Sequence, residues 1–181
     1  MIELINSGIP GCFELRPKLF QDPRGRFVKI FHKDYFLKHG LSTDFAEEYY
    51  SHSFRGVIRG LHFQTPPHDH VKMVYCVSGE VFDVVVDLRI GSPTYGKCAT
   101  FILNAEDGNC LYIPKGLAHG FCVTSETATL VYKVGTTYSP DHDSGIKWSS
   151  VDVDWPTTKP TISERDEMLV TFDSFKSPFL F

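Results

Sequence analysis

Short apolar segments separated by turn residues dominate the middle of the chain. The segments are rich in β-branched and aromatic side chains, and Gly, Pro, Ser, Asn and Asp lie between them. Short strands at regular spacing with this punctuation indicate an all-β sandwich or barrel. We expect strands at residues 71–77, 80–88, 97–103, 110–113, 119–124 and 128–134.

Residues 81–87 alternate in a way that bears on function. Side chains two positions apart share one face of a strand. One face of this segment is wholly apolar and is expected to be core, whereas on the other Asp83 and Asp87 alternate with Val81 and Val85. Two carboxylates inside a strand indicate that their face lines a polar cavity.

Helical patterns are few and short. Residues 33–40 fit one helix that ends at Gly40, and residues 163–170 fit another with Ser163 as its N-cap. The aromatic tail at 171–181 is expected to pack on the domain or on a neighbouring subunit, because aromatic surface is costly to leave in water. We interpret residues 1–181 as one jelly-roll domain in which 167–181 form an aromatic C-terminal extension.

Composition narrows the class of protein. The chain has 181 residues, a formal net charge of −4 and no long run of like charge, which argues against duplex nucleic acid and anionic membranes as partners. The five cysteines are odd in number and lie mostly in apolar runs, so we expect buried thiols in a reducing compartment. With neither a signal-peptide pattern nor an apolar stretch of membrane-spanning length, the prediction is a cytoplasmic protein.

Candidate chemistry is concentrated in three polar segments within apolar strand contexts, at residues 59–64, 114–119 and 132–138. A single strand tyrosine or histidine is more often structural than catalytic. Together, however, the segments supply a base, an acid and cations that a barrel mouth could bring to one small ligand. The residues concerned are Arg59, His62, His119, Tyr132 and Tyr138 within these segments, and Lys72, which follows the first of them.

The pattern P-x-G-x-x-H at 114–119 also resembles the second signature of cupin domains, which are double-sheet jelly rolls. Many cupins bind a metal through this histidine and through an H-x-H pair and a Glu in the first signature. Here His68 and His70 imitate the pair, but the Glu is absent. A site built from His68, His70 and His119 stays open as an alternative. We favour a polar loop and expect neither a metal nor a cofactor.

The motifs as a set resemble dTDP-4-dehydrorhamnose 3,5-epimerases, members of the cupin superfamily. The resemblance covers about residues 10–166, in order and almost without gaps. The matching segments are DPRGRF at 22–27, RGLHFQ at 59–64, GEVFDVVVDLR at 79–89, GSPTYG at 91–96, IPKGLAHGF at 113–121 and YKVGTTYSP at 132–140.

The resemblance implies an all-β, cupin-like jelly-roll homodimer that works without metal on a nucleotide sugar. It implies His62 as catalytic base with Asp166 as its partner, Tyr132 as the opposing acid, and Lys72 beside the keto oxygen. It also implies substrate contacts by several other residues. These are Arg59 at the diphosphate, Arg24 and Phe20 at the nucleotide, Tyr138 near the substrate, and Asp83 and His119 among the polar residues of the site.

The implied chemistry is consistent with these residue types. A ketone at C4 acidifies the hydrogens at C3 and C5, because loss of either gives an enolate. Inversion then requires a base on one face and an acid on the other. An imidazole can serve as the base, a lysine can stabilise charge on the C4 oxygen, and a tyrosine can return the proton.

Three positions depart from the family pattern and leave the substrate open. Glu47 and Tyr49 stand where the family usually has Gln and Asn, and Lys29 stands where it usually has Glu. A lysine can only donate hydrogen bonds, which suits a base with an acceptor there, such as cytosine. The default is C3 and C5 epimerisation of dTDP-4-dehydro-6-deoxyglucose to dTDP-4-dehydrorhamnose. The alternatives are a C3-only or C5-only epimerase, for example on a CDP-3,6-dideoxy-4-ketohexose, a metal-dependent cupin enzyme, and a non-catalytic sugar-binding cupin.

Overall fold

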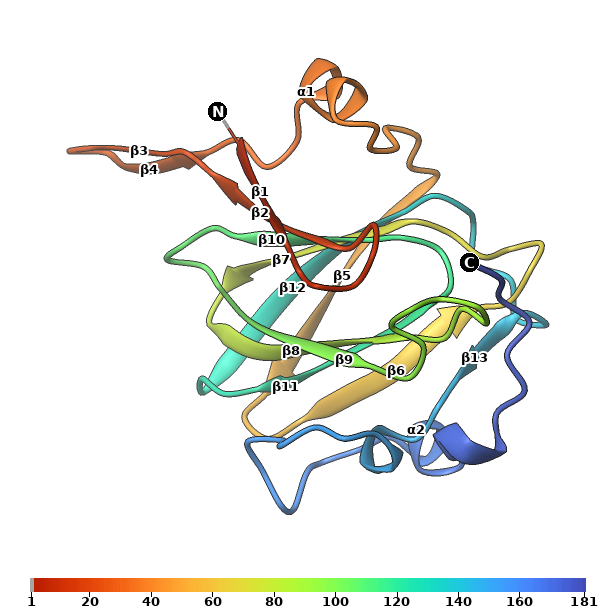
Figure 1. Ribbon diagram of the computed structural model, residues 1–181. Coiled ribbons are helices and arrows are strands. Elements are labelled where there is room, and N and C mark those ends of the chain that lie inside the picture. The colour runs from red at the N-terminus through yellow and green to blue at the C-terminus, as the bar shows by residue number, and fades with distance from the viewer. Residues whose placement is uncertain (1) are drawn as a thin grey trace.

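The computed structural model describes residues 2–181 as two antiparallel β-sheets packed face to face, a jelly roll (Figure 1). In the six-stranded sheet the order is β1 (Ile2–Asn6), β2 (Phe13–Pro17), β10 (Cys110–Ile113), β7 (Lys72–Ser78), β12 (Thr127–Val134) and β5 (Glu47–Phe54). In the five-stranded sheet it is β13 (Asp143–Gly145), β6 (Ile58–Gln64), β11 (Leu117–Val123), β8 (Glu80–Asp87) and β9 (Cys98–Asn104). All six strands expected from the sequence are present, which confirms the all-β class.

The alternation along β8 places one face between the two sheets and the other outside. Val81 and Val85 pack between the sheets, in the cluster that includes Leu130 of β12. Asp83 on the same face reaches His119 at the floor of a pocket. Asp87 reaches no pocket, so that part of the expectation is wrong. It forms a buried ion pair with Arg89 at 2.8 Å, because a buried carboxylate needs a paired charge.

The wholly apolar face of β8 is core, as expected, but the C-terminal segment covers it rather than the other sheet. Val84 and Val86 pack with Phe179, and Phe172 and Phe175 lie against the same cluster. The aromatic tail thus packs on its own chain. Its last residues, Leu180 and Phe181, are 79% and 63% exposed.

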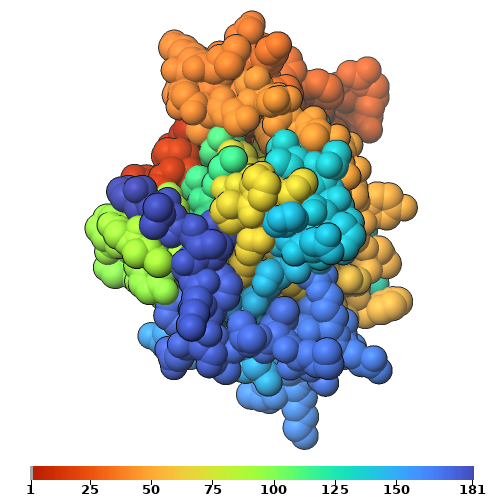
Figure 2. Space-filling model, turned by 90° about the vertical axis from the view of Figure 1, so that its right-hand side faces the viewer, coloured from red at the N-terminus to blue at the C-terminus, as the bar shows by residue number. Residues whose placement is uncertain are grey.

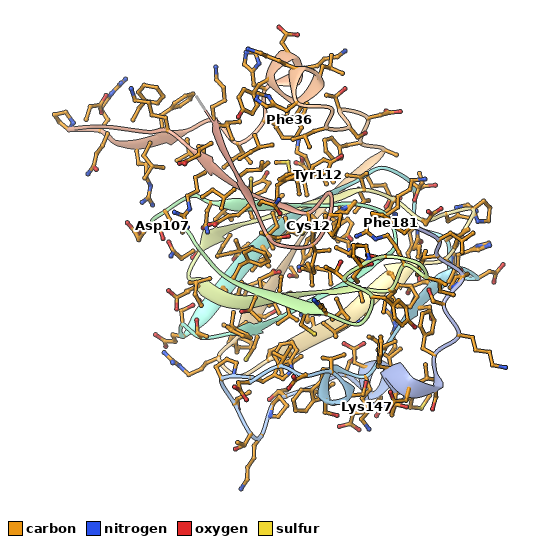
Figure 3. The ribbon with its side chains drawn as sticks, in the orientation of Figure 1. Cys12, Phe36, Asp107, Tyr112, Lys147 and Phe181 are labelled. Atoms are coloured by element: carbon orange, nitrogen blue, oxygen red, sulfur yellow. The ribbon has the colours of Figure 1, made fainter. Side chains whose placement is uncertain are left out.

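The N-terminal region covers part of the outer face of the six-stranded sheet. Helix α1 (Lys33–Lys38) follows the expected segment and buries Phe36 against Tyr112 of β10 (Figure 3). The hairpin β3 (Leu19–Asp22) and β4 (Gly25–Val28) pairs with neither main sheet and projects from the body of the protein (Figure 1). Its Phe20 and Phe27 are 50% and 61% exposed.

The remaining elements are short. Helix α2 (Glu164–Glu167) begins after Ser163, whose side chain accepts a hydrogen bond from the Asp166 amide, so the expected N-cap is confirmed. Two 3₁₀ turns, η1 (Trp148–Ser150) and η2 (Phe172–Ser174), lie in the C-terminal segment. None of the helices in residues 2–181 has the length and apolar character needed to cross a membrane.

Candidate active site

A pocket of about 450 Å³ lies between the two sheets, and both sheets contribute side chains to its wall. The segments on either side of its rim, around residues 65–75 (yellow) and 135–140 (cyan), lie next to each other in Figure 2. Most of the sequence-predicted site residues meet here. Those that line the pocket are Glu47, Tyr49, Arg59, His62, Lys72, His119, Tyr132 and Tyr138.

His62 is held by a buried carboxylate. Its Nε2 lies 2.7 Å from Oδ1 of Asp166, and Oδ2 of Asp166 accepts a hydrogen bond from the Gly60 amide at 3.1 Å. Burial would raise the pKa of Asp166, but the bonds from His62 and Gly60 outweigh it and lower the pKa. An ionised Asp166 fixes the imidazole hydrogen on Nε2, so Nδ1 keeps a free electron pair. This arrangement orients a base and stabilises its protonated form.

The backbone next to His62 requires glycine on two facing strands. Gly60 has a φ of +136°, and a Cβ there would lie 2.6 Å from the Cα of Gly120 on β11. The two strands can approach this closely only because neither residue has a side chain. The close approach lies beside the pair formed by His62 and His119, which are directly opposite each other in the register.

Tyr132 faces the pocket from β12 and is only 7% exposed. Its hydroxyl lies 3.0 Å from Oγ of Ser51, and its ring stacks on Tyr49 with centroids 4.9 Å apart and planes 17° apart. Burial raises the pKa of the Tyr132 phenol. The phenol therefore stays protonated near neutral pH and can act as a proton donor.

Lys72 lies on β7 beside a buried His–Asp pair. Burial lowers the pKa of Lys72 to about 8, against the opposing charges of Asp83 and Asp143. Burial also lowers the pKa of His119, whose Nε2 donates to Asp83 at 2.8 Å. The floor of the pocket therefore holds one ammonium group next to a neutral imidazole, which is suited to stabilising an oxyanion.

The predicted base and the predicted acid come from different sheets. His62 belongs to β6 of the five-stranded sheet, whereas Tyr132 belongs to β12 of the six-stranded sheet. A molecule bound between the sheets therefore has a proton acceptor on one side and a proton donor on the other. Inversion of a carbon centre requires this arrangement.

Cations at the pocket wall suit a negatively charged ligand. Arg59 donates through Nε to Ser53 at 2.9 Å, which leaves its terminal nitrogens available. Arg165 also lines the pocket and pairs with Asp143 at 2.9 Å. Glu47 accepts a hydrogen bond from the Tyr138 amide at 3.1 Å, so its carboxylate is held by the backbone.

Three predicted nucleotide contacts lie outside this pocket. Arg24 is paired with Asp22 at 2.6 Å, and its side chain is 90% exposed. Phe20 and Lys29 line a separate cleft between the β3–β4 hairpin and α1, together with Phe27 and Tyr35. Within one chain the structure does not bring these residues to His62 and Tyr132.

The alternative metal ligands do not come together. The His68 ring packs against His142 at a tilt, His70 bonds to Oγ1 of Thr136 at 2.8 Å, and His119 bonds to Asp83. In the part of the chain that the structure describes, residues 2–181, no three His, Cys, Asp or Glu side chains form a group that could hold a metal ion. Residues 68–70 belong to a loop, as the favoured interpretation expected.

The pocket also contains residues that sequence reasoning missed. Gln64 was part of a recognised motif but received no role, although its amide bonds to the loops at both sides of the rim. Burial and the Lys72 charge lower the pKa of His70 to about 4, so this histidine is neutral. The other missed lining residues are Ser51, Phe63, Phe121, Val134, Thr136, Asp143 and Arg165.

Comparisons with known proteins agree with this geometry. Residues 6–174 match the model of the dTDP-4-dehydrorhamnose 3,5-epimerase family. A Shigella flexneri dTDP-4-dehydrorhamnose 3,5-epimerase is 43% identical over 91% of this chain and 93% of its own. A Streptomyces niveus dTDP-4-dehydrorhamnose 3-epimerase is 42% identical over 88% of this chain and 79% of its own.

A solved structure gives the same result at the level of the fold. The dTDP-6-deoxy-D-glucose-3,5-epimerase of Legionella pneumophila, in complex with dTDP-4-keto-L-rhamnose, has a TM-score of 0.94 and is 34% identical, with all of both chains covered. The fold and these comparisons together define a jelly-roll isomerase. The chain belongs to the dTDP-4-dehydrorhamnose 3,5-epimerase family.

Proposed function

We propose that this enzyme epimerises a nucleoside-diphosphate-4-keto-6-deoxyhexose at C3, C5 or both, without metal or cofactor. The default reaction converts dTDP-4-dehydro-6-deoxyglucose to dTDP-4-dehydrorhamnose. The observation that carries the proposal is the placement of His62 and Tyr132 on opposite sheets around one pocket. The family relatives support it, since they include both a 3,5-epimerase and a 3-epimerase.

In the proposed reaction, His62 removes the hydrogen next to the ketone through Nδ1, and Asp166 stabilises the imidazolium that forms. Lys72 stabilises the enolate oxygen. Tyr132 then donates its hydroxyl proton to the same carbon from the opposite side. Each of these acid–base groups contributes about a hundred- to ten-thousand-fold in rate.

Arg59 and Arg165 on the pocket wall suit a diphosphate, because one guanidinium group can bind two phosphate oxygens at once. Glu47 places a carboxylate on the same wall. Because both Glu47 and Lys29 depart from the family pattern, a CDP-linked 4-ketohexose is the second candidate substrate.

We propose a homodimer in which Phe20, Arg24 and Lys29 contact the nucleotide in the pocket of a second copy. The projecting hairpin and its exposed aromatic residues support this proposal, because such surface is costly in water. The aromatic tail gives weaker support than the sequence suggested, since most of it packs on its own chain. We also propose that residues 1–181 form one jelly-roll domain, with 167–181 as an extension along its second sheet.

We propose a cytoplasmic location because the cysteines that the structure describes form no disulfides. All five cysteines in residues 2–181 are free, and four of them are buried. Reduced, buried thiols suit a reducing compartment.

Two experiments test the proposed function. Incubation with dTDP- and CDP-4-keto sugars in heavy water should place deuterium next to the ketone and invert that centre. A protein that only binds the sugar would incorporate none.

Metal analysis of protein purified without chelator should find less than one equivalent, whereas stoichiometric metal with activity lost on chelation would support the metal-dependent alternative.

A further inference from the structure

The hydroxyl of Tyr132 has one polar contact among residues 2–181. Ser51 Oγ lies 3.0 Å from it, and this is the only side-chain hydrogen bond of Ser51. The Tyr132 ring is enclosed by Tyr49, which stacks on it, and by His119, whose ring meets it at 72°. Among the side chains of residues 2–181, Ser51 is therefore the one placed to pass a proton to the Tyr132 oxygen.

The reaction makes such a return necessary. After Tyr132 has protonated the sugar carbon, its phenolate is left in a buried position where the pKa of the phenol is raised. An enzyme that inverts two centres of one bound substrate must restore the phenol before the second inversion. Tyr132 is 7% exposed, whereas Ser51 on the edge strand β5 is only half-buried and so is more accessible to water.

We propose that Ser51 relays a proton from water to Tyr132 and so resets the catalytic acid between inversions. This inference rests on the proposed function. A serine hydroxyl has one donor and two acceptor positions, so it can pass on one proton while it accepts another. Ser51 lines the pocket on β5, an edge strand, and lies opposite Leu130 of β12 in the register.

The proton balance closes over one inversion. The O–H bond of Tyr132 breaks as the new C–H bond forms, which leaves a phenolate. Ser51 gives its proton to the phenolate oxygen while it takes one from a water molecule, so no serine alkoxide forms. The resulting hydroxide is neutralised by the proton that His62 has taken from carbon and releases to solvent.

A pre-steady-state experiment separates relay from positioning. In Ser51→Ala, Tyr132 begins each experiment protonated, so the first inversion at each site should proceed at nearly the wild-type rate. Turnover should then slow by about ten-fold or more, because the phenolate waits for its proton. Rapid quench, with the enzyme at a concentration close to that of the substrate, should therefore show a burst of one inverted carbon per active site in Ser51→Ala. The wild-type enzyme should show no such burst.

Matched variants control for shape and folding. Ser51→Thr keeps the hydroxyl and should restore turnover, whereas Ser51→Val has the shape of threonine without the hydroxyl and should behave like Ser51→Ala. The pair also tests the relay if Ser51→Ala fails to fold. Thr129→Val removes a hydroxyl from β12 whose partner is His52, outside the pocket, and should leave both phases unchanged.

The outcomes are distinct. A first inversion slowed as much as turnover would show that Ser51 only positions Tyr132, and unchanged turnover would show that Ser51 has no part; either result overturns the relay. Failure of the wild-type enzyme to invert any 4-keto sugar would instead overturn the proposed function.

Discussion

Loss of the Lys72 charge should determine the alkaline limit of activity. Burial lowers the pKa of this ammonium from 10.5 to about 8. A lowered lysine pKa means that the charge is present below pH 8 and is lost as the pH rises through that value. The enolate oxygen then loses its cationic partner. The pH at which activity begins to fall should therefore lie about 2.5 pH units below the pKa of an ordinary lysine.

The size of the effect follows from the titration curve. With a pKa of about 8, Lys72 is about nine-tenths charged at pH 7 and about one-tenth charged at pH 9. The ratio kcat/KM should therefore fall by about ten-fold for each pH unit above 8. This ratio reports groups of the free enzyme, which is the state that the structure describes.

The assay is the initial rate of epimerisation between about pH 6 and pH 10, compared among three proteins. Lys72→Met should lower kcat/KM near neutral pH by about a hundred- to a thousand-fold and should lose the limb near pH 8. Lys72→Arg keeps a charge that does not titrate in this range and should move the limb to higher pH. A wild-type profile that stays flat to about pH 9.5, or a Lys72→Met profile with the same limb, would refute the assigned role.

Four other outcomes follow from the same site. His62→Asn should lower deuterium exchange next to the ketone by about a hundred-fold or more with an unchanged circular dichroism spectrum, and wild-type exchange would exclude His62 as the base. Tyr132→Phe should impair inversion more than exchange, since proton removal does not need the phenol; equal losses would leave Tyr132 a binding role only. Light scattering at micromolar concentration should give twice the mass of one chain, and a monomer would contradict the proposed contact of the hairpin with a second copy. Calorimetry should show that Lys29→Glu shifts the ratio of CDP affinity to dTDP affinity by about ten-fold in favour of dTDP; an unchanged ratio would disprove the role of Lys29 at the base.

Local patterns were enough to predict strands β7 to β12 and to single out polar segments that line the pocket, but not strands β5 and β6, which carry Ser51 and His62. The segment at 128–134 forms β12 within one residue, and Ser163 caps the helix that carries Asp166. These features depend on neighbours in sequence, through alternation and capping. The resemblance to a family then connected His62 with Asp166, which are 104 positions apart in the chain.

Features that depend on packing between distant segments could not be predicted in this way. Alternation showed that Asp83 and Asp87 share a face, but only the tertiary structure shows that Asp83 meets His119, 36 positions further along the chain. Ser51 lies in a strand of mixed polarity, and the role proposed for it depends on the pairing of β5 with β12. The proposed nucleotide contact of Phe20 needs a second copy of the chain, and local patterns carry no information about where that copy lies.

The central claim is that one pocket removes a proton next to a ketone from one side and returns a proton from the other. The most direct test is incubation of the wild-type enzyme with dTDP-4-dehydro-6-deoxyglucose, and separately with a CDP-linked 4-ketohexose, in heavy water, followed by NMR of the sugar. The account predicts inverted C3, C5 or both, with one deuterium at each inverted carbon. Inversion without deuterium, or a sugar recovered unchanged and unlabelled with both nucleotides, would contradict it.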